Sequence, residues 1–396
     1  MRRAVVYRMV AISLPAGAVA LAVAAVLAEV WVRLTWEERR GQPGFYEADP
    51  VRGQRLRAGY DGWFSGVPVK INQLSFRDHR EYAIAKGPQT FRVVVLGDSV
   101  TFGHGSVFER TYPYLLEQQL RAWRPAVDWQ VWNLGVPGYN TRQEWAYLQE
   151  VAGTFAPDLV VVGFFPNDLV DNRMPPPKSA IRNATSSAAS WIRAQWYSAE
   201  WYRRIYLTAR WRLSFAAGGP PPEARLNVDD RVVPAGADVV DAEEQNLTPF
   251  ETLTDVQMAS NECPSGSRPG TEGVENLQRD AGWPDFVSAV RDLQGMHTAG
   301  AVRLVFFLNV APPVCPDGDF FYDGGSSYVN RLFLDVMGQG TPAISAFDAF
   351  LPLRPSQMPN AGGHSLGNAN LVKASVLSAY LRESVLPPLL AAQGQP

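Results

Sequence analysis

The sequence predicts an α/β domain built on a parallel sheet, with a transmembrane helix ahead of it. Two observations support this prediction. From residue 91 onward, short apolar runs alternate with helical patterns, which is typical of a parallel sheet with helices on both faces. Near the N-terminus, the stretch from Met9 to Ala28 carries no charge and has about the 20 residues needed to span ~30 Å of hydrocarbon.

Residues 1–36 are expected to be a membrane anchor or a signal segment. Trp31 and Trp36 follow the apolar stretch, where aromatic side chains anchor a span at the membrane surface. A cleaved signal peptide is the alternative, because residues 26–28 (Val-Leu-Ala) could serve as a processing site. The apolar run is long for a signal peptide, which favours an uncleaved anchor. Basic residues precede the stretch and predict a cytoplasmic N-terminus with the rest of the chain exported: Arg2, Arg3 and Arg8.

Composition and charge fit one large domain behind this anchor. Of the 396 residues, 46% are hydrophobic, which suffices for a large core. The net charge of −3 gives no electrostatic reason to expect nucleic acid as a partner. Cys263 and Cys315 are the only cysteines. In an exported chain they permit one disulfide, but both could also stay unpaired, and their spacing offers no zinc site.

The order of the apolar and helical patterns predicts four parts, of which residues 1–36 are the first. Residues 37–90 form an irregular approach segment with a small strand pair around Gly62 to Leu74, residues 91–385 form the main domain, and residues 386–396 form a tail. Strands are expected at 91–96, 127–133, 158–165, 302–309 and 342–347. Helices are expected at Tyr112 to Trp123, Arg142 to Thr154, Pro284 to Met296, Tyr328 to Val336 and Asn368 to Leu381.

Residues 173–280 do not follow the alternation and are interpreted as an insertion. Its part from Ser186 to Phe215 has a helical composition with four tryptophans and five arginines. Three interpretations stay open: a helix packed on the domain with arginine stems covering the aromatic rings, an amphipathic helix on the bilayer surface, or a lid over the active site. The acidic stretch from Asp229 to Glu244 matches no calcium loop and is expected to be solvated.

Residues 92–99, Arg-Val-Val-Val-Leu-Gly-Asp-Ser, combine a buried strand with a candidate nucleophile. Ser99 is expected at the C-terminal end of a central parallel strand, where open α/β sheets bind their ligands. The N-terminus of a following helix would favour negative charge developing there. A plain strand-to-helix turn would use the same Gly, Asp and Ser for their turn propensities, so this segment alone leaves both interpretations open.

Three ordered segments resemble the signature blocks of the GDSL/SGNH hydrolase superfamily. The first is Gly-Asp-Ser at 97–99. Residues 131–141, Val-Trp-Asn-Leu-Gly-Val-Pro-Gly-Tyr-Asn-Thr, resemble the second block, in which a glycine lends its N–H to the oxyanion hole; the resemblance assigns this role to Gly138. Residues 159–168 resemble the third block, a strand ending in Asn-Asp, and the resemblance assigns the side-chain oxyanion donor to Asn167.

The resemblance covers roughly residues 70–170 and 300–385. It implies a three-layer α/β/α sandwich with a flavodoxin-like sheet, Ser99 as nucleophile and a histidine before a late helix as base. His364 is the histidine in that position. The backbone N–H of Ser99 would complete the oxyanion hole with Gly138 and Asn167. Supporting positions next to these groups are Asp98 and Asp168.

The other three histidines have simpler interpretations. His79 lies in a charged loop and is expected to be solvated, and His297 lies at a helix end, where it would help to cap the C-terminus. His104 follows Ser99 too closely to act as an oriented base, although it could line the pocket.

The sequence departs from the family where a carboxylate should orient the histidine. The family usually carries Asp two or three residues before the histidine, and here those positions are Gly362 and Ala361. Losing the acid of a triad can cost roughly 10⁴ in turnover. Three explanations stay open: a Ser–His dyad oriented by a backbone carbonyl, a carboxylate from elsewhere such as Asp348 or Asp319, or a site decayed into a binding module. The presence of Ser99 and both oxyanion donors favours an active site.

The sequence thus predicts an exported serine esterase that hydrolyses acyl esters of carbohydrate or lipid. Serine needs an adjacent base, and histidine titrates near neutrality and can take and return the proton. No metal or organic cofactor is expected. The alternatives are a polysaccharide O-acetyltransferase of the same fold and a non-catalytic glycan-binding envelope protein.

Overall fold

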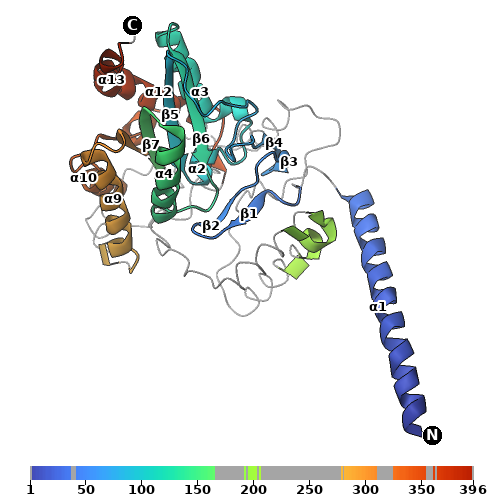
Figure 1. Cartoon of the computed structure of the whole chain (residues 1–396). Helices are drawn as coiled ribbons and strands as arrows, with labels where there is room; N and C mark the ends of the chain where they lie inside the picture. Colours follow the sequence, from blue (N-terminus) through green and yellow to red (C-terminus); the bar gives the residue numbers. More distant parts are fainter. Residues whose placement is uncertain are drawn as a thin grey trace.

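A computed structural model of the chain describes ten segments: residues 2–36, 42–165, 191–192, 195–202, 205–206, 278–279, 281–309, 324–353, 360–361 and 364–394. They form an α/β domain and one long helix, α1 (Arg2–Thr35), that projects away from it (Figure 1). Within α1, the segment Pro15–Thr35 is long and apolar enough to cross a membrane, a property that a signal sequence near the N-terminus would share.

The core of the domain is a five-stranded parallel sheet, as the sequence predicts. Its strands lie in the order β6-β5-β7-β8-β9. Counted along the chain, these are the second, first, third, fourth and fifth strands of the sheet, which is the flavodoxin order. The bounds are β5 (Thr90–Gly97), β6 (Asp128–Gly135), β7 (Leu159–Phe164), β8 (Leu304–Leu308) and β9 (Ala343–Ser345).

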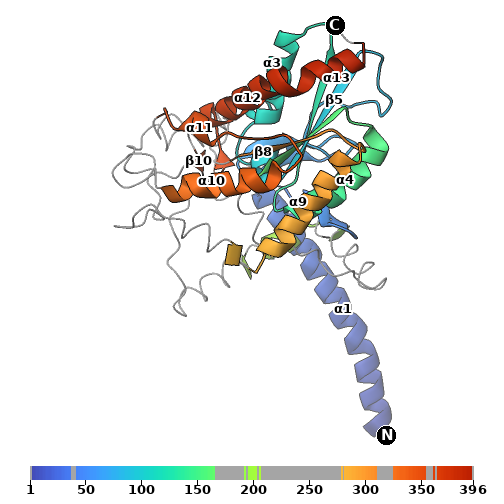
Figure 2. The same ribbon diagram turned by 90° about the vertical axis from the view of Figure 1, so that its left-hand side faces the viewer.

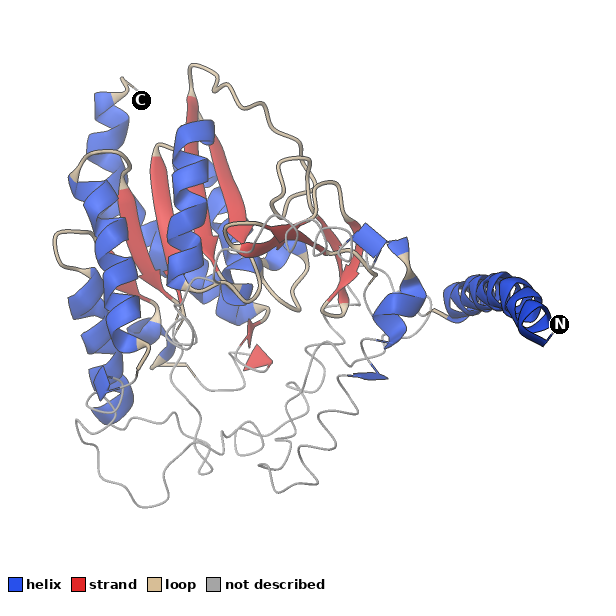
Figure 3. Cartoon of the chain, turned by 60° about the horizontal axis from the view of Figure 1, so that its bottom comes forward, coloured by secondary structure: helices blue, strands red, loops and turns tan. Residues whose placement is uncertain are grey.

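Helices cover both faces because alternate residues of each strand face opposite sides. Val94 and Leu96 of β5 pack on the face of α4 (Thr141–Phe155), α9 (Trp283–Thr298) and α10 (Gly324–Met337). Val93 and Val95 pack on the other face, which is covered by α3 (Tyr112–Trp123), α11 (Phe347–Phe350), α12 (Asn368–Tyr380) and α13 (Leu386–Ala392). Figures 2 and 3 show this three-layer arrangement.

The approach segment is more ordered than the sequence predicts. It forms two antiparallel hairpins, β1 (Tyr46–Asp49) with β2 (Gly53–Leu56) and β3 (Asp61–Phe64) with β4 (Val67–Lys70). The second hairpin overlaps the range predicted for a strand pair, around Gly62 to Leu74. Its buried residues belong to the same hydrophobic cluster as the strands of the sheet, so this segment is part of the domain core. In Figures 1 and 3 the hairpins lie between the sheet and α1.

Residues 386–396, expected to be a tail, include a helix that packs on the domain. A π-helical turn (Leu381–Val385) follows α12 and leads into α13. Leu386 and Leu390 are buried in the cluster that covers the α12 face. The two prolines at 387 and 388 hide this helix from a pattern search, but proline is tolerated in the first turn, where no backbone partner is needed.

Several predicted features lie outside the described residues. They include most of the insertion at 173–280, with its acidic stretch, and both cysteines, Cys263 and Cys315. Of the helical part of the insertion, the structure describes 191–192, 195–202 and 205–206.

Candidate active site

Ser99 is the first residue of a short helix, α2 (Ser99–Phe102), that begins directly at the end of β5. Asp98 caps this helix: its Oδ1 accepts a hydrogen bond from the Val100 N–H at 2.8 Å. The carbonyl of Ser99 accepts hydrogen bonds from the N–H groups of Gly103 and His104, at 3.1 and 3.0 Å. The turn is therefore fixed by the Asp98 side chain at its start and by two backbone hydrogen bonds to the Ser99 carbonyl.

Three glycines at the ends of neighbouring strands make room for this turn. Gly97 of β5 pairs with Gly135 of β6 on one side and Gly163 of β7 on the other. A Cβ on Gly135 would lie 2.2 Å from the Phe102 nitrogen, and a Cβ on Gly97 or Gly163 would lie 2.0 or 2.4 Å from Thr101 Oγ1. Helix α2 lies against the strand ends only because these positions lack side chains.

His364 reaches the serine from the far end of the chain. Its Nε2 lies 2.8 Å from Ser99 Oγ, within hydrogen-bonding distance. It begins β11 (His364–Ser365), which pairs with β10 (Asn360–Ala361) just before α12. The buried Asn370 of α12 fixes this strand, because its Nδ2 donates to the Ser365 carbonyl and to Ser106 Oγ, both at 3.0 Å.

A second histidine, His104, lies against the first. The rings of His104 and His364 are stacked, with centroids 4.4 Å apart and planes inclined by 28°. Nδ1 of His104 lies 2.8 Å from Ser65 Oγ. Ser65 and Gly66 form the two-residue turn between β3 and β4, and both have positive φ, at 56° and 78°, which suits a type I′ hairpin. The approach segment is thus connected to His364 through the ring of His104.

The loop that carries His104 is held by a buried arginine. Arg77 donates to the carbonyls of Phe102 and Gly103, both at 2.7 Å, and to that of Ser106 at 2.5 Å. Its side chain is 1% exposed. The sequence around Arg77 is charged and gives the pattern of a solvated loop, so no sequence signal could have revealed this role. The neighbouring His79 is half exposed, as expected, with Nδ1 3.9 Å from a Glu109 carboxylate oxygen.

The candidate oxyanion donors are described only in part. Gly138 lies in the loop after β6 with a φ of +83° and an exposed backbone. Among the described residues, its N–H donates to no protein acceptor. This loop begins beside β5, because the Val136 N–H donates to the Gly97 carbonyl at 2.9 Å. Asn167 and Asp168 lie outside the described residues, two and three positions beyond the last described residue after β7.

The two carboxylates considered for orienting His364 are also placed in part. Asp348 lies on α11 with an exposed side chain, and Asp319 lies outside the described residues.

Away from this site, His297 accepts a hydrogen bond at Nδ1 from the Leu304 N–H at 3.0 Å, so it joins α9 to β8. Within the described part of the chain, no three His, Cys, Asp or Glu side chains gather as a metal-binding group.

Two buried ionisable side chains, Lys373 and Glu144, interact electrostatically with Asp98, next to Ser99. Lys373 of α12 is fully buried, and burial lowers its pKa to about 7, an effect that the Asp98 carboxylate opposes. Glu144 of α4 is also fully buried, and burial together with the Asp98 charge raises its pKa. The sequence did not indicate that Lys373 and Glu144 would be buried, because lysine and glutamate on a helix are usually solvated.

The lowered pKa of Lys373 predicts a pH-dependent stability. An unfolded lysine titrates near pH 10.4, so between about pH 7 and that value the unfolded chain binds more protons than the folded one. Stability contributed by this group therefore rises with pH in that window, by at most ~1.4 kcal/mol per pH unit. Lys373→Met is expected to remove this rise. Urea unfolding at about pH 7 and pH 9 measures it, with the exposed Lys70→Met as control. Equal slopes in wild type and Lys373→Met would contradict the prediction.

Comparisons with known proteins complete this description. Residues 95–251 match the family described as GDSL-like Lipase/Acylhydrolase. No curated protein matches the chain. Several solved structures are similar to it at low identity, and three of them serve as examples. A GDSL-like lipase from Bacteroides thetaiotaomicron is 10% identical, with 74% of this chain and 88% of that chain covered and a TM-score of 0.33.

The second similar structure is a catalytic mutant of an acetylxylan esterase from Geobacillus stearothermophilus, which is 14% identical to this chain. The match covers 74% of this chain and 93% of that chain, with a TM-score of 0.37. The third is an alpha/beta hydrolase enzyme from the metagenome of Lake Arreo, 16% identical, with 77% and 95% covered and a TM-score of 0.34.

Proposed function

We propose that this chain, which carries a GDSL-like lipase/acylhydrolase domain, is an exported serine esterase that acts on acyl esters of carbohydrate or lipid. The observation that carries the proposal is the 2.8 Å contact between Ser99 Oγ and His364 Nε2 at the end of the central strand. This edge of a flavodoxin-like sheet, between its first and third strands, is where such folds bind their ligands.

The reaction proceeds through an acyl-enzyme. Ser99 Oγ attacks the ester carbonyl carbon while His364 Nε2 takes the hydroxyl proton. The tetrahedral oxyanion is held by the N–H groups of Ser99 and Gly138 and by the Asn167 amide, each worth about 3 kcal/mol of barrier. His364 then returns the proton to the leaving alkoxide. Water attacks the acyl-serine with His364 as base, and the carboxylic acid is released as the serine is restored.

The ring of His104 acts here as a positioning group for His364. A base must hold its lone pair on the serine hydroxyl, and the positions two and three residues before His364, where the family usually carries the orienting Asp, are Gly362 and Ala361. Stacking at 4.4 Å restricts tilt of the His364 ring, and the Ser65 hydroxyl in turn fixes the ring of His104. Aromatic stacking of this kind contributes about 0.5–1.5 kcal/mol.

His104→Ala is expected to lower kcat about tenfold, since ~1.4 kcal/mol of lost positioning corresponds to that factor. His104→Phe, which keeps an aromatic ring against His364, is expected to recover most of the loss. Steady-state hydrolysis of p-nitrophenyl acetate by the full chain in detergent measures both variants. If His104→Phe is as slow as His104→Ala, the loss of kcat is due to the missing hydrogen bond with Ser65, and ring stacking does not position His364.

A fluorophosphonate probe tests the proposed nucleophile directly. The wild-type chain in detergent is expected to be labelled covalently and Ser99→Ala is expected to take no label, because the probe reacts only with an activated serine. Ser288→Ala, on α9, serves as a control that should label like the wild type. Absence of labelling in folded wild-type protein would instead favour the non-catalytic binding protein.

The proposed location follows from α1. The span Pro15–Thr35 would remain as an uncleaved anchor, with the basic N-terminus in the cytoplasm and the esterase domain on the other side. An envelope location would present ester-bearing polysaccharide or lipid to the site. Product analysis with and without a sugar acceptor distinguishes hydrolysis from acyl transfer.

A further inference from the structure

The last turns of α1 are bonded to the insertion. Both carboxylate oxygens of Glu29 accept hydrogen bonds from the start of the helix at 197–202: from the N–H groups of Tyr197 and Ser198, at 3.0 and 2.8 Å, and from Ser198 Oγ at 2.6 Å. Arg33 Nε donates to the same carboxylate at 2.6 Å. The glutamate is 8% exposed, so a buried charge is satisfied only while α1 and this segment stay together.

Aromatic contacts join the same two segments. The rings of Trp31 and Trp201 meet edge to face with centroids 6.0 Å apart, and those of Trp36 and Tyr197 do so at 5.2 Å. The Arg33 guanidinium lies 4.7 Å from the centroid of the Tyr197 ring. These contacts fix the direction in which α1 leaves the insertion.

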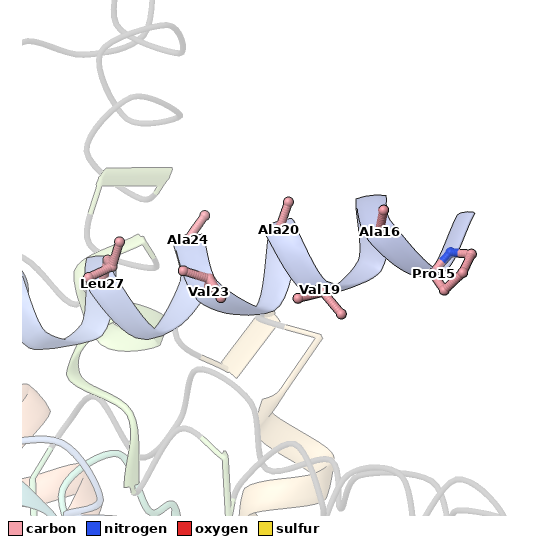
Figure 4. A pocket seen from close by; sticks show the side chains of 7 residues that line it. All are labelled: Pro15, Ala16, Val19, Ala20, Val23, Ala24 and Leu27. Carbon is pink, nitrogen blue, oxygen red and sulfur yellow. The ribbon is translucent and has the colours of Figure 1, made fainter. Parts of the chain in front are cut away.

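Around this junction, large apolar side chains face outward. Tyr202, Ile205 and Tyr206 have the i, i+3, i+4 spacing that places side chains on one face of a helix. The face of α1 that precedes Glu29 also carries only apolar side chains, from Pro15 to Leu27 (Figure 4). We call the junction residues the juxtamembrane patch; each is 46–64% exposed: Trp31, Trp191, Ile192, Tyr202, Ile205 and Tyr206.

We propose that the juxtamembrane patch lies in the interfacial layer of the bilayer that α1 crosses. The patch continues the apolar surface of the span, and tryptophan and tyrosine are the side chains enriched at that depth. Grouped exposed aromatics of this kind mark an interaction surface rather than a water-facing one. The proposal rests on the proposed anchor but not on the proposed chemistry of Ser99. Of the three interpretations of the helical insertion, it selects the helix on the bilayer surface for the described residues 191–192, 195–202 and 205–206.

The position of Glu29 agrees with this depth. A charged side chain near the end of a span must be bonded to protein or reach the interface. Here the carboxylate receives three donors from the insertion and one from Arg33, so the insertion must come down to the level of Glu29. The aromatic residues that follow along the insertion then lie where lipid headgroups meet acyl chains.

Hydrophobic photolabelling of the full chain tests the proposal. The protein is reconstituted in phosphatidylcholine/phosphatidylglycerol vesicles and exposed to an apolar diazirine that partitions into the bilayer, and labelled peptides are mapped by mass spectrometry. We expect label in α1 and in 191–206, with roughly tenfold less at Ile84 and Leu371, exposed apolar residues of the esterase domain. Tyr202→Glu/Tyr206→Glu should lose the label in 191–206 and keep both the α1 label and soluble-ester hydrolysis.

The outcomes separate the two proposals. Label in α1 without label in 191–206 would overturn the inference while leaving the anchor and the esterase intact. Label in neither would overturn the anchor and the inference together, and fluorophosphonate labelling would still report on the enzyme.

Discussion

His364→Ala is expected to lower kcat for p-nitrophenyl acetate by about 10⁴-fold or more, with little change in folded stability. Without an imidazole 2.8 Å from Ser99 Oγ, no group in the described site can take the serine proton as the bond to carbon forms. His364 is only partly buried, at the start of a two-residue strand. Its side chain therefore contributes little to the core, and the thermal unfolding temperature should change little.

The control for this prediction is His79→Ala, which removes a histidine outside the site and should leave kcat unchanged. A double variant, Ser99→Ala with His364→Ala, should be no slower than either single variant, because the two residues act as one unit. A decrease of tenfold or less in His364→Ala would show that another base serves Ser99.

Gly135→Ala is expected to lower the free energy of unfolding by about 3 kcal/mol and to abolish most activity. The added Cβ would lie 2.2 Å from the Phe102 nitrogen and 2.8 Å from its Cα, and backbone atoms cannot move aside as a flexible side chain does. Either β6 or α2 must shift, and α2 carries Ser99 at its first position. Urea unfolding and ester hydrolysis measure the two effects.

The matched control is Gly153→Ala in the last turn of α4. A Cβ there would meet no atom within 4 Å, and alanine is favoured over glycine inside a helix by roughly 0.5–1 kcal/mol. This variant should therefore be slightly more stable and fully active. A Gly135→Ala protein with wild-type stability would mean that the strand ends tolerate a side chain and that the turn is looser than its geometry implies.

The strands and most helices could be predicted because they follow from burial. Strands β5, β7 and β8 are buried along their whole length and so appear as largely apolar runs, and α3 begins and ends where its pattern does. The hairpin β1–β2 was missed because four-residue strands with polar, partly exposed side chains leave no such pattern. Helix α13 was missed because prolines occupy its first turn.

The pairing of Ser99 with His364 followed from motif order, since both lie at ends of elements that a parallel sheet gathers at one edge. The parts that sequence could not supply are contacts between distant, unpatterned positions. Nothing in the local sequence says that Ser65 would meet His104, or that Arg77 would be buried under the loop after α2. Such contacts depend on how the hairpins dock, which no periodicity records.

The docking of the second hairpin limits how this enzyme can be shortened. A soluble form that starts at residue 91 would retain the whole parallel sheet and yet lose Phe45, Tyr60, Val67 and Val69 from the cluster on one side of it. It would also lose the serine that holds the ring of His104. A version without α1 therefore has to begin ahead of Phe45, so that both hairpins are kept with the sheet against which they pack.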